Sequence, residues 1–252
     1  MHQVASSTDK GRHRAINEDS ILCLRTENFY MVADGVGGHN SGELASKLAT
    51  ELIEAYIKTH PIISITDESA LKNYFLNSLL EVNASILEQA HRIPENLGMA
   101  TTVVLAYIAF GKAYVVNIGD SRAYLIRDGN MLQITEDHSY VNTLLKQGII
   151  TQEEAVNHPK RNLITRALGS EEKVEPDFYM FKIYEGDRIL LCSDGLYNEI
   201  EEKEMSTLAQ QAVSIEVMVQ ELVRRANEYG GRDNISVICI EIQKQEKEID
   251  HE

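Results

Sequence analysis

Cysteine is scarce in this chain, and its few copies lie far apart. The 252 residues include three cysteines, Cys23, Cys192 and Cys239, each in an apolar, strand-like run. No two are close enough to form a zinc-binding pair, and an odd, well-spaced set is typical of reduced core thiols in a cytosolic protein. We therefore expect a cytoplasmic protein whose cysteines take no part in chemistry.

Basic residues and long apolar runs are also in short supply. Lys and Arg total 24 against 39 Asp and Glu, a formal net charge of −15. Such a charge repels polyanions, so we expect neither nucleic acid nor an anionic membrane as a main partner. The longest apolar stretch, residues 101–110, is too short to cross a bilayer, and residues 1–4 have no apolar signal core.

Linkers and internal repeats are absent from the sequence as well. No stretch rich in Pro, Gly or Ser divides it, and 43% of its residues are hydrophobic, which is enough for one large core. We predict one domain over residues 1–245, followed by a polar tail at 246–252, and a monomer in solution.

Strand-like apolar runs account for most of what is present. Short turns join several of them, which favours antiparallel sheet. One such turn, Asp128-Gly129, is an ordinary hairpin signal. The predicted strands are 20–25, 29–33, 101–110, 112–118, 121–127, 130–134, 178–183, 187–192 and 235–242.

Helical periodicity marks two segments early in the chain and two late. The first covers about 41–58, and the second begins near Asp67, whose side chain suits an N-cap. Late helices are predicted at about 201–211 and 214–228. Because strand runs and helix pairs are segregated, we infer an α+β fold of sheets covered by helices.

A polar insert at about 136–174 separates two of the predicted strands. It holds two short helical pieces, and Thr151 to Glu154 form a capping box. Inserts of this length in a compact domain are typical of lids and binding elements. The second half carries Lys160, Arg161 and Arg166 in an otherwise acidic protein. We therefore expect Arg161 to contact the substrate.

Four short acidic motifs carry the chemical signal. Three of them adjoin an apolar strand-like run, where a carboxylate is costly unless it is paired or bound to a cation. Carboxylate oxygens suit hard ions such as Mg²⁺ and Mn²⁺, and two such ions can activate a water for attack on phosphorus. The motifs are Asn17-Glu18-Asp19, Ala33-Asp34-Gly35, Ser193-Asp194-Gly195 and Arg232-Asp233-Asn234.

Eight motifs stand in a characteristic order: RAINED (14–19), DGVGGHNSGE (34–43), GMATT (98–102), GDSR (119–122), DHS (137–139), LITRALG (163–169), SDG (193–195) and GRDN (231–234). Together they resemble those of the metal-dependent protein phosphatases, the type 2C serine/threonine (PPM) family, in its compact bacterial form. The resemblance implies a four-layer α-β-β-α sandwich, with two antiparallel sheets, flanking helix pairs and a metal centre between the sheets at one end.

The resemblance also assigns metal ligands. Asp34 would bridge two ions, Mn²⁺ or Mg²⁺. Glu18 and the backbone carbonyl of Gly35 would complete one site, and Asp194 and Asp233 would complete the other.

Further roles follow from the same resemblance. Asp19 resembles the residue that orients metal-bound water, and Asp120 resembles a ligand of a weaker third metal. Arg14 matches the arginine that grips the substrate phosphate, which suits a guanidinium fork. Animal members carry a histidine directly after the Asp-Gly pair, where this chain has Val36. That leaves His39 or metal-bound water as the general acid.

The implied reaction is hydrolysis of phosphoserine and phosphothreonine on proteins by a metal-activated water, without a covalent phospho-enzyme. Phosphoproteins are the implied substrates, and a bacterial serine/threonine kinase is the implied opposing partner. The resemblance places the insert at 136–174, called the flap, next to the metal centre.

Three alternatives stand beside this interpretation. A dinucleotide loop after strand 29–33 would need a third glycine where Asn40 stands, and strict β-α-β alternation is absent. A catalytically silent relative would bind phosphoproteins or metal without turnover, and an activity assay separates it. A hydrolase of small phosphate esters alone would be recognised by comparing a phosphopeptide with a nucleotide.

Overall fold

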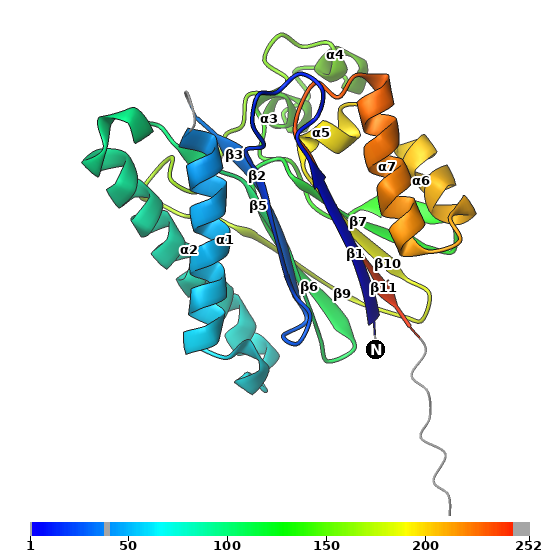
Figure 1. Cartoon of the computed structure of the whole chain (residues 1–252), viewed down its shortest axis with the longest axis horizontal. Helices are drawn as coiled ribbons and strands as arrows, with labels where there is room; N and C mark the ends of the chain where they lie inside the picture. The colour runs from blue at the N-terminus through cyan, green and yellow to red at the C-terminus, as the bar shows by residue number, and fades with distance from the viewer. Residues whose placement is uncertain (1, 38–40, 244–252) are drawn as a thin grey trace, which may run out of the picture.

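Two antiparallel sheets, packed face to face, form the centre of the computed structural model (Figure 1). The structure describes residues 2–37 and 41–243. Short connections between neighbouring strands, such as the turn with Asp128 at φ 50° and Gly129 at φ 76°, produce the antiparallel order. The predicted tail at 246–252 lies outside the described residues.

The first sheet combines the N-terminal strand with strands from the second half of the chain. Its order is β1 (His2–Asp9), β11 (Ile235–Ile242), β10 (Arg188–Cys192), β7 (Arg122–Arg127) and β8 (Asn130–Gln133). The second sheet has the order β2 (Asp19–Leu24), β3 (Phe29–Val36), β5 (Val103–Ala109), β6 (Lys112–Ile118) and β9 (Asp177–Lys182), and β4 (Ala100–Thr101) pairs with β3.

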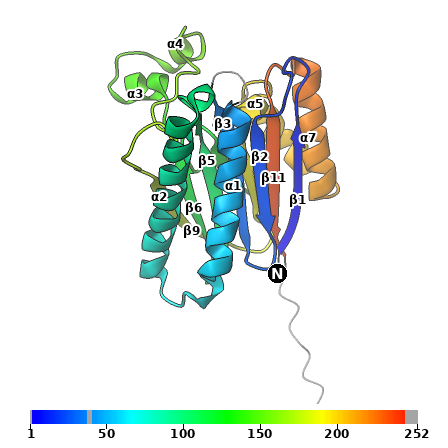
Figure 2. The ribbon, with the colours of Figure 1, turned by 60° about the vertical axis from the view of Figure 1, so that its left-hand side comes forward.

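Helix pairs cover the outer face of each sheet, as Figures 1 and 2 show from two sides. The second sheet is covered by α1 (Ser41–Thr59) and α2 (Glu68–Arg92), and the first by α6 (Glu202–Gln211) and α7 (Ile215–Tyr229). The shorter helices are η1 (Ile62–Ser64), η2 (Pro94–Asn96), α3 (Tyr140–Lys146), α4 (Gln152–Val156) and α5 (Asp194–Tyr197).

Three apolar layers hold the sandwich together. The middle layer lies between the sheets and includes Val32 and Val104 from one sheet and Leu191 and Ile238 from the other. The two outer layers join each sheet to its helix pair. Burying apolar side chains on both faces of both sheets is the main source of stability in such an architecture. The predicted α-β-β-α sandwich is therefore confirmed.

Local sequence signals set several element boundaries as predicted. Asp67 caps α2 by accepting a hydrogen bond from the Ser69 backbone N–H at 2.9 Å. The capping box of Thr151 and Glu154 starts α4 within the flap. The predicted strand at 101–110 is broken at Thr102, whose side chain accepts from the Asp34 backbone N–H at 3.1 Å.

The strand β1 was not predicted from the sequence. Only Val4 and Ala5 of its residues are buried, so it lacks a clear alternating pattern. Its pairing with β11 runs from His2↔Ile242 to Asp9↔Ile235, and this long-range ladder determines its conformation.

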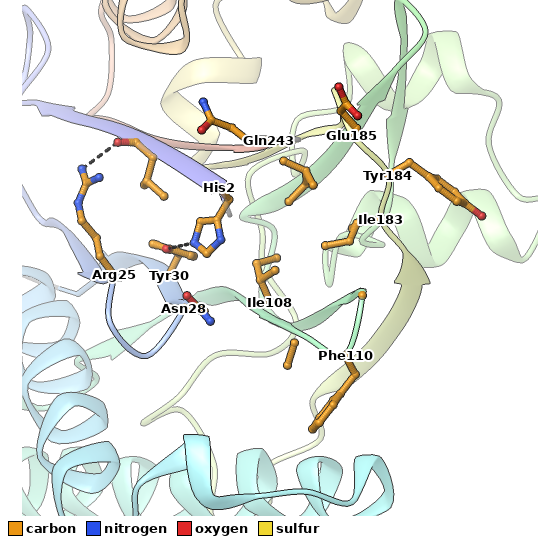
Figure 3. A pocket seen from close by; sticks show the side chains of 14 residues that line it. His2, Arg25, Asn28, Tyr30, Ile108, Phe110, Ile183, Tyr184, Glu185 and Gln243 are labelled. Atoms are coloured by element: carbon orange, nitrogen blue, oxygen red, sulfur yellow. Dashed lines mark hydrogen bonds between the residues drawn. The ribbon is translucent and has the colours of Figure 1, made fainter. Parts of the chain in front are cut away.

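A hollow of about 770 Å³ opens at the end of the sandwich where β1 begins (Figure 3). The Nε2 atom of His2 lies 2.5 Å from the hydroxyl of Tyr30 there, and Arg25 donates to the carbonyl of Val4 at 2.8 Å. Of the described residues that line it, Glu185 alone carries a carboxylate. The hollow lies at the opposite end of β3 from Asp34, so we assign it no part in metal binding.

In the part of the chain that the structure describes, no helix is long and apolar enough to cross a membrane.

Candidate metal centre

The acids predicted from the sequence gather at one end of the sandwich. Asp19 begins β2 and is paired in register with Asp34 of β3, while Asp194 follows β10 and Asp233 precedes β11. Burial raises the pKa of Asp34 well above its ordinary value. The charges of Asp19, Asp194, Asp120 and Asp233 raise it further, so these carboxylates are close neighbours.

The pKa values of neighbouring carboxyl groups are also raised. Burial, followed by the charges of Asp120, Asp233 and Asp19, raises the pKa of Asp194 well above its ordinary value. Burial raises the pKa of Asp19 to about 6 and that of Asp120 to about 7. Adjacent buried carboxylates stay ionised together only with a compensating cation. The chemistry of this cluster therefore fits positive charge.

Two oxygens in the cluster have no hydrogen-bond partner. They are Oε1 of Glu18 and Oδ1 of Asp19, both buried among the described residues. An orphaned buried oxygen is rare and needs an explanation such as an ion or a water. Hard divalent cations bind carboxylate oxygens, backbone carbonyls and water, so Mg²⁺ or Mn²⁺ fits these atoms.

The guanidinium of Arg14 brings a positive charge to the cluster. Its Nη2 lies 2.6 Å from Oδ2 of Asp233, and its Nη1 lies 3.3 Å from Oε2 of Glu18. Among the described residues, no three His, Cys, Asp or Glu side chains stand in a geometry that would hold one ion between them. The fold thus gathers the predicted ligands at one end of the sandwich, namely Glu18, Asp34, Asp194 and Asp233. That they bind a metal ion remains a prediction.

Glycines let the backbone approach the acids closely. A Cβ on Gly42 would lie 2.6 Å from Oε1 of Glu18 and 2.8 Å from the carbonyl oxygen of Gly35. A Cβ on Gly35 would lie 2.0 Å from the Gly42 carbonyl oxygen. These contacts leave no room for a side chain, so the start of α1 presses directly against the Glu18 carboxylate. The carbonyl of Gly35, a predicted ligand, sits inside this crowded corner.

A hydroxyl orients the Asp19 carboxylate, and two threonines hold the backbone of Asp34; sequence reasoning missed all three residues. Ser193 donates from Oγ to Oδ2 of Asp19 at 2.7 Å, which leaves Oδ1 of Asp19 unpartnered. Thr101 donates from Oγ1 to the Asp34 carbonyl at 3.0 Å, and the Thr102 backbone N–H donates to the same carbonyl at 2.8 Å. Ser193 and both threonines lie within the recognised motifs, which was the available signal.

A packed group of side chains holds Asp120 at the edge of the cluster. The hydroxyl of Tyr197 donates to the backbone carbonyl of Asp120 at 2.9 Å. The Tyr197 ring carries the guanidinium of Arg122 at 3.6 Å from its centroid, and Arg122 also donates to both carboxylate oxygens of Asp137. Asp137 begins the flap, so this group connects the flap to the acids.

A cleft of about 750 Å³ leads from Asp120 and Asp194 to the flap. Of the three basic residues expected there, Arg161 lines the cleft. Lys160 instead lies over the ring of Tyr140, 5.2 Å from its centroid, and Arg166 pairs with Asp177 at 3.3 Å. His39, the candidate general acid, lies outside the described residues.

Comparisons with known proteins agree with this fold. The sequence model of the family described as Protein phosphatase 2C matches residues 2–235. The serine/threonine phosphatase stp of Listeria welshimeri is 37% identical over 244 residues, which cover 95% of this chain and 96% of that protein.

Solved structures give the same result. The serine/threonine phosphatase of S. agalactiae superimposes with a TM-score of 0.90 at 31% identity, covering 96% of this chain and 100% of that one. The catalytic domain of the serine threonine protein phosphatase PstP, solved in complex with 2 manganese ions, gives a TM-score of 0.83 at 34% identity, covering 96% and 99%.

Facing sheets with carboxylates at one end, on a fold shared with these enzymes, define a protein phosphatase. The chain belongs to the protein phosphatase 2C family. The predicted activity, that of a serine/threonine protein phosphatase, is thereby confirmed.

The close contact at Gly42 gives a first testable prediction. In Gly42→Ala the new methyl group would push the Glu18 carboxylate away, so Mn²⁺ affinity should fall by about 10–100-fold, as for other losses of ligand support. Helix α1 should survive, because alanine favours a helix over glycine by about 1 kcal/mol. Titration calorimetry with Mn²⁺ and a thermal melt measure the two effects. Unchanged Mn²⁺ affinity would show that Glu18 does not bind the ion.

The contacts of Arg14 give a second prediction. Because its guanidinium occupies oxygens of Glu18 and Asp233, it competes with a bound cation for them. Arg14→Ala should therefore bind Mn²⁺ up to about fivefold more tightly, in line with the 0.2–1 kcal/mol of an exposed ion pair. Arg12→Ala, on the same loop and without an ion pair among the described residues, is the control. Weaker binding in Arg14→Ala would instead mean that Arg14 supports the acids.

Proposed function

We propose that this phosphatase hydrolyses phosphoserine and phosphothreonine on proteins with two divalent ions, Mn²⁺ or Mg²⁺, at the acid cluster. The observation that carries the proposal is the group of buried, mutually repelling carboxylates with two orphaned oxygens. The manganese ions of the PstP complex support the same assignment. When bound, the ions would lower the pKa of a water and offset charge on the phosphoryl group.

Each acid receives a role in this proposal. Asp34 would be the ligand common to both ions, Glu18 and the Gly35 carbonyl would help to hold one of them, and Asp194 and Asp233 would help to hold the other. The two sets adjoin different sheets, since Glu18 directly precedes β2 and Asp34 lies in β3, whereas Asp194 follows β10 and Asp233 precedes β11.

Asp19 and Arg14 act on the reactants directly. Asp19 is fixed by Ser193 through one oxygen and keeps the other free to accept a hydrogen bond from the attacking water. Arg14 is 44% exposed at its side chain, so its guanidinium can reach a phosphate at the mouth of the site. A guanidinium fork binds two phosphate oxygens at once, which orients phosphorus toward that water.

Two parts of the proposal concern the edges of the site. Asp120 would hold a weaker third ion, shared with Asp194, because it is buried and its charge lies close enough to raise the pKa of Asp194. The general acid would be His39 or a water.

The wider context of the enzyme is part of the same proposal. We take residues 1–245 as one catalytic domain, acting as a cytoplasmic monomer on phosphoproteins produced by a serine/threonine kinase. The bacterial relatives and the free state of Cys23, Cys192 and Cys239 support this view.

Replacing one ligand tests the metal mechanism. Asp194→Asn keeps the side chain's shape but removes its charge, and an amide binds a hard cation far less well. Phosphate release from a phosphothreonine peptide with Mn²⁺ should fall by at least about 10²–10³-fold, the loss typical of a group that stabilises the transition state. Chelator-treated wild type should be equally inactive. Turnover near the wild-type value in either sample would rule out the proposed mechanism.

The cleft residue Arg161 tests the role of the flap. Arg161→Ala should slow dephosphorylation of a phosphoprotein and spare p-nitrophenyl phosphate, which is too small to reach the flap. The loss should shrink with added salt, since exposed charges are screened over a Debye length of about 8 Å at physiological ionic strength. Lys160→Ala, on the same flap but turned to Tyr140, is the control. Equal loss on both substrates would place Arg161 in the phosphate site itself.

A further inference from the structure

The loop at 10–18 joins β1 to β2 and carries both Arg14 and Glu18. It runs across the end of the sandwich beside α5 and α7 (Figure 1). It contains no helix, and its strand pairing ends at Asp9 and resumes at Asp19. Something other than a regular ladder must therefore hold two active-site groups in place.

The amide of Asn234 makes three hydrogen bonds to this loop. Its Oδ1 accepts from the Glu18 backbone N–H at 2.8 Å. Its Nδ2 donates to the carbonyls of Lys10 at 2.8 Å and Ile16 at 2.9 Å. The residue is only 3% exposed, so water cannot replace these bonds without opening the structure.

Neighbours of Asn234 hold the rest of the loop. The carbonyl of Gly231 accepts from the backbone N–H of Arg12 at 2.8 Å and of His13 at 3.2 Å. A Cβ on Gly11 would lie 2.2 Å from the Asp233 carbonyl oxygen, so the two backbones are in direct contact. The segment 231–234 thus acts as the support on which the loop rests, and Asn234 provides its only side-chain amide.

We propose that Asn234 is a positioning residue for catalysis. It fixes the loop so that the Glu18 carboxylate stays at Gly42 and the Arg14 guanidinium stays at the mouth of the acid cluster, where the phosphate would bind. It touches no reacting atom itself and acts through Glu18 and Arg14. This inference rests on the proposed function, because it assumes that those two residues serve the ion and the phosphate.

A second asparagine in the chain offers a matched control. Asn83 of α2 is 2% exposed, donates to the carbonyls of Glu171 at 2.9 Å and Glu172 at 3.4 Å, and accepts from the Gly169 N–H at 2.7 Å. It therefore has the same number and kinds of bonds as Asn234 but holds the end of the flap. Removing either amide deprives two carbonyls and one N–H of their side-chain partner.

The experiment compares Asn234→Leu with Asn83→Leu, since leucine has the same branching and number of side-chain heavy atoms as asparagine without its hydrogen bonds. Both variants should lose thermal stability to a similar extent. Asn234→Leu alone should lose about 10–100-fold in Mn²⁺ affinity by calorimetry, the usual effect of removing a group that orients a ligand. It should also raise the KM for p-nitrophenyl phosphate, and amide exchange should speed up across residues 11–18. Asn83→Leu should keep wild-type values for all three.

The outcomes distinguish the positioning role of Asn234 from the proposed function. Equal Mn²⁺ affinity and KM in both variants, with the stability loss present, would overturn the positioning role. Wild-type protein that releases no phosphate from p-nitrophenyl phosphate or from a phosphothreonine peptide would overturn the proposed function instead. If Asn234→Leu does not fold, Asn234→Ser is measured in its place. Its shorter side chain cannot span the same three partners, so the same affinity loss is expected, and wild-type affinity would again contradict the proposal.

Discussion

Mutual repulsion among buried carboxylates is the constraint on which this structure depends. Burial and the charges of neighbouring acids, Asp233 among them, raise the cost of ionising Asp19, Asp34, Asp120 and Asp194 at one end of the sandwich. In an isolated protein such a cluster favours separation of the strands that carry it. The three apolar layers, and the hydroxyls that fix individual acids, keep it together. The strongly negative site thus lowers the stability of the fold at this end.

Backbone packing determines how finely the acids are placed. The β2–β3 register sets Asp19 opposite Asp34, so these two carboxylates cannot shift independently. The contact between Gly35 and Gly42 brings α1 against Glu18, and a Cβ on Gly195 would lie 2.0 Å from the Asn234 carbonyl oxygen. At these two points the chain approaches itself more closely than any side chain would permit. Small residues here are therefore requirements of geometry.

Most helices and strands could be predicted because their signals are local, whereas the four-layer arrangement came from the family resemblance of the motifs. The N-cap at Asp67 and the capping box at Thr151 depend on neighbours within a few residues. The sequence did not predict β1, whose conformation depends on β11 at the far end of the chain. The roles of Ser193, Thr102 and Asn234 were missed for the same reason. Each acts on a residue far away in sequence, such as Asp19 at a separation of 174 from Ser193. Nor does any local pattern reveal that Arg14 pairs with Asp233, a separation of 219.

The acid cluster is divided between the two sheets, and this division has a mechanical consequence. Asp19 and Asp34 lie in strands of one sheet, whereas Asp194 and Asp233 adjoin strands of the other. The distance across the cluster is therefore set by the thickness of the middle apolar layer, where Val32 and Val104 meet Leu191 and Ile238. Packed interiors transmit strain because they contain few voids. A methyl group added or removed in that layer would change the distance between the two groups of carboxylates. The residues that perform the reaction would themselves be unchanged.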